Sequence, residues 1–167
     1  MIRVVVDDIA FLAADAVIRP ATETLEPTSS ALRHLEQVAG AALQAQIRVQ
    51  QALGVGAAVV TAAGDLPTEF VIHAVIAGRR EPVSRLTVQR ALTSALQRAV
   101  DWELARVTVP PIGTGAGNLT MEDAAEVMCD VLTRHMAETT FPAEVQIVVE
   151  SEAEKQVFEG YLRRVGP

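Results

Sequence analysis

The sequence predicts an α/β domain in which helices cover both faces of a largely parallel sheet. Short apolar runs rich in valine and isoleucine alternate with longer stretches whose apolar residues recur at helical spacing. The short runs are apolar at nearly every position, as expected for strands that are buried on both faces. A chain of 167 residues without a repeat or a linker suits one domain, which we place at residues 1–167.

The N-terminal part of the chain predicts two strands and one long helix. Residues 2–6 form a β-branched run, and residues 15–18 form a second run that Pro20 should stop. Residues 19–29 are polar and rich in proline, so we expect a loop there. Residues 30–53 carry apolar side chains at helical spacing and are followed by two glycines, which predicts a single long helix.

The rest of the chain continues the alternation of strands and helices. The expected elements, in chain order, are strands at 57–61 and 70–76, a helix at 84–104, a strand at 107–109, a helix from Thr120, a strand at 145–149 and a helix from Ser151. In such sheets, ligands bind beyond the carboxyl ends of the strands. The loops that follow the strands are therefore the places to look for a site.

The most distinctive loop is Pro110–Asn118, which reads PPIGTGAGN between a strand and a helix. Glycines permit close backbone approach, and a helix N-terminus presents free N–H groups, so this pattern can hold a phosphate or diphosphate. The stretch lacks the Lys-Ser/Thr pair of a Walker A loop, and Asn118 replaces the last glycine of the dinucleotide fingerprint. A tight connection without a ligand is an equally good interpretation of this loop alone.

Composition narrows the classes of function. The net charge of −7 argues against a general nucleic-acid or anionic-membrane binder, although backbone N–H groups can still form a local anion site. Cys129 is the one cysteine, so no internal disulfide can form, and no Cys/His cluster has metal-site spacing. We expect neither a metal nor a cofactor. No apolar run has the length of a membrane span, and we expect a cytoplasmic setting.

Several single residues allow more than one interpretation. His73 lies in an apolar strand and is expected to be a hydrogen-bonded core histidine rather than a catalytic base. Cys129 lies beside the apolar face of its helix and is expected to be a small core residue. His34 is expected at the surface of its helix. Arg19 can neutralise Glu26 or reach a ligand phosphate, and the sequence does not decide between the two.

Three separated stretches together resemble the macro domain, a family that binds ADP-ribose. Asp7–Ala10 followed by Asp15–Ile18 resembles the Gly-Asp-Ile-Thr and Asp-Ala-Ile-Val runs of the family at the right spacing. Gly56–Val75 resembles its central pair of strands, and Pro110–Asn118 followed by Thr120–Ala125 resembles its diphosphate-binding loop and helix. The resemblance covers nearly the whole chain and implies a three-layer α/β/α sandwich with a mixed, largely parallel sheet.

The resemblance also implies roles for individual residues. Asp8 stands where the family's aspartate accepts a hydrogen bond from the adenine amino group, and Ile9 stands beside adenine. An aromatic residue often lies over the distal ribose at the position that an alanine occupies here. The residues that match the loop around the diphosphate and distal ribose are Gly113, Thr114, Gly115, Ala116, Gly117 and Asn118.

Two departures from the family pattern affect the ligand-binding end. Thr22 stands where the second asparagine of the family's Asn-Ala-Ala-Asn contacts the distal ribose, so one hydroxyl replaces an amide. The family's first glycine-rich loop is replaced by residues 25–30, which contain no glycine. Glu26 adds a negative charge there, whereas Ser29 and Ser30 can donate to phosphate at the start of a helix.

Three functions remain open at this point. The first, which we prefer, is binding of ADP-ribose or a related nucleotide diphosphate at the carboxyl edge of the sheet, with ADP-ribosylated proteins as candidate partners. The second is hydrolysis of an ADP-ribosyl bond or of an acetylated ADP-ribose, for which the loss of asparagine at Thr22 is unfavourable. The third is an interaction module without nucleotide binding, in which residues 25–30 fill the cleft.

Overall fold

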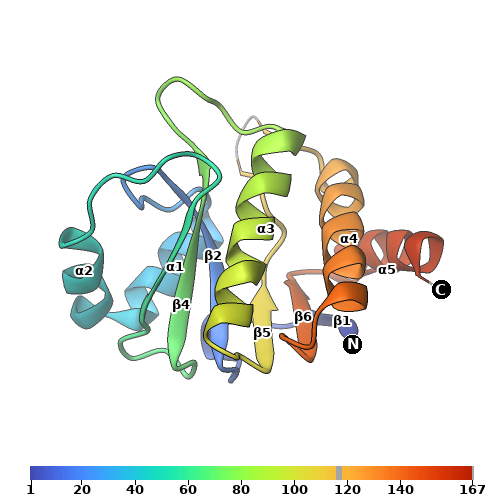
Figure 1. The fold of residues 1–167 in the computed structure, drawn as a ribbon, viewed down its shortest axis with the longest axis horizontal. Coiled ribbons are helices and arrows are strands. Elements are labelled where there is room, and N and C mark those ends of the chain that lie inside the picture. The colour runs from blue at the N-terminus through green and yellow to red at the C-terminus, as the bar shows by residue number, and fades with distance from the viewer. Residues whose placement is uncertain (116–117, 167) are drawn as a thin grey trace.

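A computed structural model describes residues 1–115 and 118–166 of the chain (Figure 1). Strands and helices alternate along most of it. The elements in chain order are β1 (Ile2–Val6), the short 3₁₀ helix η1 (Ile9–Phe11), β2 (Ala16–Thr22), α1 (Ser30–Ala39), α2 (Ala41–Arg48), β3 (Ala58–Ala62), β4 (Phe70–Ala77), α3 (Arg85–Asp101), β5 (Arg106–Val109), α4 (Met121–Glu138), β6 (Glu144–Val149) and α5 (Glu152–Val165).

The strands form one six-stranded sheet in the order β1-β6-β5-β2-β4-β3. Every neighbouring pair is parallel except β3 and β4, which are antiparallel, with Val59 opposite His73. The prediction of a mixed, largely parallel sheet is therefore confirmed. β1, β5 and β6 run in register, so that Val4 faces Ile147, and Ile147 faces Val109.

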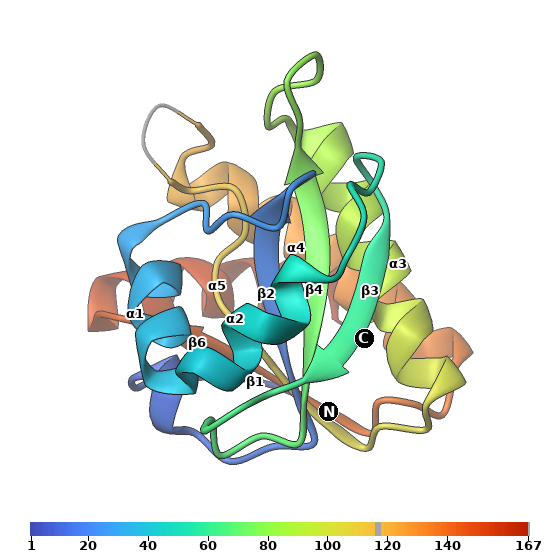
Figure 2. The same ribbon diagram turned by 90° about the vertical axis from the view of Figure 1, so that its left-hand side faces the viewer.

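Helices cover both faces of the sheet and make it the middle of three layers. α1 and α2 lie in front of the sheet in Figure 2, with α3 and α4 behind it. The larger apolar core lies between the sheet and α3, α4 and α5, where Leu92, Met128 and Phe158 are fully buried. A smaller core on the opposite face contains Leu35 of α1 and Leu43 of α2. This is the three-layer α/β/α arrangement that the resemblance implies.

The parallel direction of β1, β5 and β6 brings the segments that follow them to one edge of the sheet. Asp7 follows β1, Pro110 follows β5 and Glu150 follows β6. The N-terminus of α1 reaches the same edge, because residues 28–31, 33 and 34 line one cleft together with these segments. The fold thus brings four polar candidates to a single place, namely Asp8, Ser29, Ser30 and Thr114.

The long helix expected at 30–53 is wrong, because two shorter helices occupy this region. α1 ends at Ala39, and Gly40 follows with φ of +78°, a left-handed conformation that glycine adopts without a steric penalty. The Gly40 N–H donates to the carbonyl of Glu36 at 3.0 Å, which closes the last turn of α1. α2 then ends at Arg48, so Gly54 and Gly56 do not terminate a helix.

The loop expected at 19–29 is also partly wrong, because β2 continues through Thr22. β5 pairs with β2 only as far as Val17, and from there β2 keeps β4 as its partner, with Pro20 opposite Ala74. Proline lacks an N–H donor and is tolerated where a strand has lost one neighbour. The extension carries Arg19 into the interior, where it is fully buried.

Candidate functional site

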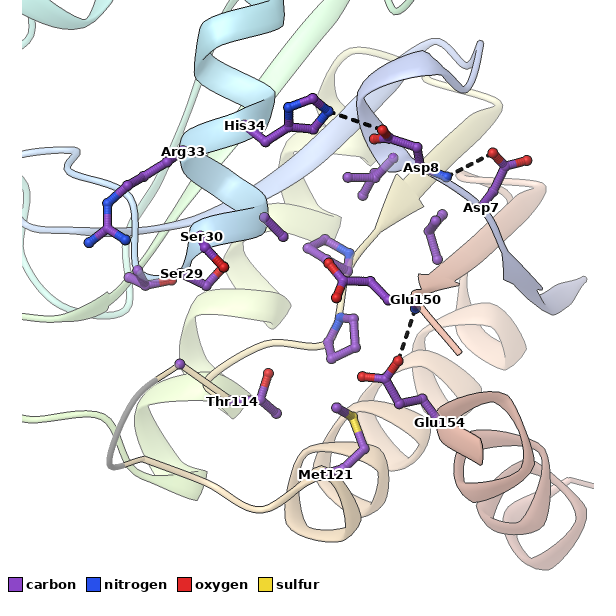
Figure 3. Close-up of a pocket in the computed structure, with 17 residues that line it drawn as sticks. Asp7, Asp8, Ser29, Ser30, Arg33, His34, Thr114, Met121, Glu150 and Glu154 are labelled. Carbon is purple, nitrogen blue, oxygen red and sulfur yellow. Dashed lines mark hydrogen bonds and ion pairs between the residues drawn. The ribbon is translucent and has the colours of Figure 1, made fainter. Parts of the chain in front are cut away.

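A cleft of about 840 Å³ opens at the carboxyl edge of the sheet (Figure 3). Its walls come from the end of β1, the start of α1, the segment after β5 and the end of β6. The lining residues are Asp7, Asp8, Ile9, Thr28, Ser29, Ser30, Ala31, Arg33, His34, Pro110, Pro111, Thr114, Gly115, Met121, Val148, Glu150 and Glu154. The lining combines apolar side chains with polar and charged ones, as small-molecule sites commonly do.

The cleft brings together four of the site residues predicted from the sequence, namely Asp8, Ile9, Thr114 and Gly115. The other three for which the structure gives a position are not among the residues that line it: Thr22, Gly113 and Asn118. The remaining two predicted residues, Ala116 and Gly117, lie outside the described residues.

Asp8 holds the start of η1 and reaches the rim of the cleft. Its Oδ1 accepts a hydrogen bond from the N–H of Ala10 at 3.0 Å, and its Oδ2 lies 3.0 Å from Nε2 of His34. A carboxylate only accepts, so His34 is the donor in that pair. The side chains of Asp8 and His34 are 45% and 47% exposed. Each carboxylate oxygen has a second lone pair, so Asp8 can still accept a hydrogen bond from a ligand amine.

Gly113 shapes the segment that follows β5. Its φ is +86°, and a Cβ built there would lie 3.0 Å from Val88 and 3.2 Å from Leu119 and Val83. The N–H of Leu119 donates to the carbonyl of Gly113 at 2.9 Å, and the N–H of Asn118 donates to Gly115 at 3.1 Å. The positive φ of Gly113 and the close packing around it therefore fix the path of this turn, although Gly113 does not line the cleft.

Gly115 brings this turn against the segment that precedes α1. A Cβ built on Gly115 would lie 2.1 Å from the carbonyl oxygen of Thr28, so the two backbones are in direct contact. Within the described part of the chain, the N–H groups of Thr114 and Gly115 donate no hydrogen bond. They can therefore donate to an anion that binds in the cleft beside this contact.

The start of α1 supplies the opposite side of this end of the cleft. Ser29 is the N-cap, and its Oγ accepts a hydrogen bond from the N–H of Leu32 at 3.4 Å. Ser30 and Ala31 occupy the first two helical positions, whose N–H groups have no acceptor within a helix. The expectation that this segment starts a helix is confirmed, with Ser29 as its cap and Ser30 as its first residue. Positive partial charge at the helix start favours an anion here.

Thr22 holds the tight turn that leads into α1. Its Oγ1 accepts a hydrogen bond from the N–H of Glu26 at 3.1 Å and lies 3.2 Å from Oγ1 of Thr24. The N–H of Thr22 in turn donates to the carbonyl of Glu26 at 3.0 Å. Glu26 is exposed and does not line the cleft, so its carboxylate lies away from the place where an anion would bind.

Arg19 takes neither of the two roles considered from the sequence. It is 0% exposed, and its Nη2 donates to the carbonyl of Leu25 at 2.7 Å and to the carboxylate of Glu36 on α1. Its Nη1 lies 3.1 Å from Nδ1 of His73. Burial lowers the pKa of Arg19, and the neighbouring Glu36 carboxylate opposes that shift. Arg19 thus ties the sheet, the turn at Leu25 and α1 together.

His73 is the hydrogen-bonded core histidine that the sequence predicts. The guanidinium of Arg19 can only donate, so Nδ1 of His73 is the acceptor and Nε2 carries the proton. Nε2 then donates to Oγ1 of Thr61 at 2.9 Å, and that hydroxyl donates to the carbonyl of Ala62 at 3.0 Å. Burial and the positive charge of Arg19 lower the pKa of His73 to about 3.

The pKa of His73 predicts a loss of stability in mild acid. In the unfolded chain His73 titrates near 6.5, whereas in the folded protein it stays neutral down to about pH 3. Between these values the unfolded state binds more protons, so stability falls as the pH falls. From pH 6 to pH 5 we expect His73 to remove about 1 kcal/mol of unfolding free energy. Urea titrations of the wild type and a His73→Gln variant should differ in this pH slope.

The thiol of Cys129 is another buried group with a shifted pKa. Cys129 is fully buried, and burial raises the pKa of its thiol to about 12, so the prediction of a core cysteine is confirmed.

The described residues contain no group of three or more His, Cys, Asp or Glu side chains that could hold a metal ion. We find no helix in the described residues that is long and apolar enough to cross a membrane.

The charges of the cleft are arranged unevenly. Asp8 and Glu150 lie on the side formed by the ends of β1 and β6, whereas Ser29, Ser30 and Arg33 lie at the start of α1 (Figure 3). One side therefore favours hydrogen-bond donors of a ligand, and the other favours an anion. Sequence reasoning missed the positions of Arg33, His34 and Glu150 in the cleft. For Arg33, the signal was available in its spacing of four residues from the cap at Ser29, which puts both on one helix face.

Comparison with known proteins identifies the class to which this fold and cleft belong. A family model described as "Macro domain" matches residues 18–128. The chain belongs to the macro domain family. An O-acetyl-ADP-ribose deacetylase from Escherichia coli (strain K12) is 29% identical over 172 residues, which cover 99% of this chain and 97% of that protein.

Other relatives agree with this assignment. An uncharacterized protein from Mycobacterium tuberculosis (strain ATCC 25618 / H37Rv) is 29% identical over 128 residues, 77% of this chain. The matched region spans 36% of the length of that mycobacterial relative. A macrodomain of Oceanobacillus iheyensis with ADP has a TM-score of 0.87 at 20% identity, over 97% of this chain and 90% of that one. A macrodomain of Trypanosoma brucei in complex with ADP-ribose has a TM-score of 0.85 at 18% identity, over 95% and 68%.

Proposed function

We propose that this macro domain binds ADP-ribose or a related nucleotide diphosphate in the cleft at the carboxyl edge of the sheet. The observation that carries the proposal is the uneven charge of the cleft. Carboxylates at one end suit the amino group of a base, and free N–H groups at the other suit a diphosphate. Relatives whose names include ADP-ribose support the same choice of ligand.

The proposal gives each part of the cleft a role. Asp8 accepts a hydrogen bond from the base amine, and Ile9 packs beside the base. The start of α1 and the N–H groups of Thr114 and Gly115 hold the diphosphate. A distal ribose would extend past the Thr28–Gly115 contact toward Thr22 and Asn118, and the roles of Ala116 and Gly117 in holding it remain part of the prediction. The open cleft weighs against an interaction module in which residues 25–30 fill the site.

Calorimetric titration of the purified chain with ADP-ribose tests the proposal. We expect saturable binding, and we expect Asp8→Ala to weaken it about tenfold through loss of one charge-assisted hydrogen bond. Asp130→Ala is a matched control, because Asp130 is exposed on α4 and does not line the cleft. A folded wild-type chain that shows no heat with ADP-ribose, ADP or AMP would remove the proposal.

A second candidate is hydrolysis of an ADP-ribosyl or acetyl-ADP-ribose bond. It is favoured by the full-length similarity to the Escherichia coli deacetylase. The hydroxyl of Thr22 is engaged with Glu26 and Thr24, which leaves it poorly available to position a substrate. Release of acetate from O-acetyl-ADP-ribose, compared between the wild type and Thr22→Asn, measures this activity. A rate at background level for the wild type would restrict the protein to binding.

The bounds of the functional domain, its partners and the compartment in which it acts are also proposed here. We propose that residues 1–167 act as one domain and that ADP-ribosylated proteins are partners in the cytoplasm. The single cysteine, whose thiol is buried, suits a reducing compartment. Pull-down with an ADP-ribosylated and an unmodified form of the same protein would separate recognition of the modification from recognition of its carrier.

A further inference from the structure

Arg33 is the one permanently charged cation among the residues that line the cleft. The lining also contains four carboxylates, from Asp7, Asp8, Glu150 and Glu154, and the chain as a whole carries a net charge of −7. A diphosphate that enters this cleft therefore meets an unfavourable field unless a cation stands close to it. His34, the other basic residue of the lining, is occupied by its contact with Asp8.

The backbone of α1 places Arg33 over the first turn of the helix, beside Ser29. Side chains on a helix tilt toward its N-terminus, so the side chain at position 33 covers the turn that begins at Ser29. The N–H of Arg33 donates to the carbonyl of Ser29 at 3.1 Å, which fixes the two residues one turn apart. Figure 3 shows the Arg33 guanidinium beside Ser29, on the side of α1 away from the Asp8–His34 pair.

The guanidinium of Arg33 is available to a ligand. No carboxylate of the described residues lies within salt-bridge distance of it, and it donates no hydrogen bond to another described residue. By contrast, Arg85 and Arg90, which lie outside the cleft, are paired with acidic side chains. Asp8 and Glu154, on the carboxylate side, accept hydrogen bonds from within the chain.

Resting on the proposed nucleotide function, we propose that Arg33 binds the diphosphate and supplies the charge that the glycine-free segment at 25–30 does not provide. Its planar guanidinium can donate two parallel hydrogen bonds to phosphate oxygens while the N–H groups of Ser30 and Ala31 donate from the helix start. The phosphate is thus held between a side-chain cation on α1 and the backbone of Thr114 and Gly115. Recognition of phosphate in this chain then depends on a side chain and not on backbone alone.

The test compares ligands with and without phosphate. Arg33→Gln should weaken binding of ADP and of pyrophosphate about tenfold to fiftyfold and should leave the affinity for adenosine unchanged. Arg33→Lys keeps the charge but loses the planar fork. Its affinity for ADP should therefore lie between that of the wild type and that of Arg33→Gln. The matched control is Arg48→Gln, which removes an equal charge from an exposed position outside the cleft.

The outcomes separate this inference from the proposed function. If the wild type binds ADP and Arg33→Gln binds it equally well, Arg33 has no role in phosphate recognition and only this inference is overturned. If the wild type binds none of the three ligands ADP-ribose, ADP and pyrophosphate, both this inference and the proposed function are overturned. A loss of adenosine binding in Arg33→Gln that matches the loss of ADP binding would assign Arg33 to shaping the cleft, and it would overturn phosphate recognition.

Discussion

Replacement of Arg19 by methionine is expected to lower the unfolding free energy by about 3–5 kcal/mol. Arg19 is fully buried, and its partner Glu36 has a side chain that is only 14% exposed. Removal of the guanidinium leaves the Glu36 carboxylate without its counter-charge. It also leaves Nδ1 of His73 and the carbonyl of Leu25 without a donor. Each buried acceptor without a partner adds its own desolvation cost.

Urea unfolding at neutral pH measures this effect, with Arg48→Gln as a control at an exposed position. The double variant Arg19→Met/Glu36→Leu should recover part of the loss, because an apolar pair in place of a buried ion pair removes the uncompensated charge. His73 would still lack its donor, so recovery should be incomplete. A loss below about 1 kcal/mol for Arg19→Met would show that the network does not contribute to stability.

The layers of this fold follow from local sequence patterns, whereas the Arg19 network does not. Apolar β-branched runs and helical spacing are properties of neighbouring residues, and they predict the strands and most helices. Arg19 meets Glu36 and His73 only because α1 packs on the sheet and β4 pairs with β2. An arginine directly after an apolar run gives no local sign of the partners that make its burial possible. The sequence left its role open for this reason.

The error at Gly40 has a related cause. Apolar side chains of α1 and α2 face the same core, so their helical spacing continues across the break and predicts one helix. The break lies in the backbone: a Cβ at Gly40 would lie 2.9 Å from Oδ2 of Asp65, and its φ is positive. Glycine within a helical pattern is ambiguous without the neighbours that surround it.

The residues of the candidate site also fall into some that could be recognised in the sequence and some that could not. Asp8 and the glycine loop were recognisable because each directly follows a strand, and strand ends meet at one edge of a parallel sheet. Glu150 also follows a strand and could have been found by the same rule, whereas the place of Arg33 in the cleft depends on how α1 packs beside it. The contact between Gly115 and Thr28 joins positions that are far apart in the chain, and no periodicity predicts it.

Substitution of Gly115 by alanine is expected to weaken binding of ADP-ribose about a hundredfold while the protein stays folded. The added Cβ would lie 2.1 Å from the Thr28 carbonyl oxygen, a distance that a carbon atom cannot adopt, so the two segments must move apart. That movement takes the N–H groups of Thr114 and Gly115 away from the start of α1. Loss of two hydrogen bonds to a charged group, at about 1.5 kcal/mol each, corresponds to roughly a hundredfold in affinity.

The matched control is Gly54→Ala. A Cβ at Gly54 meets no atom within 4 Å, so this variant makes the same chemical change without a steric conflict. Thermal unfolding of both variants should stay close to the wild type, because Gly115 lies in a connecting segment outside the apolar cores. Calorimetry with ADP-ribose should then separate them. Tighter binding by Gly115→Ala would contradict the prediction, because the Gly115–Thr28 contact would then be a closed state that the ligand must open and not the arrangement that holds the diphosphate.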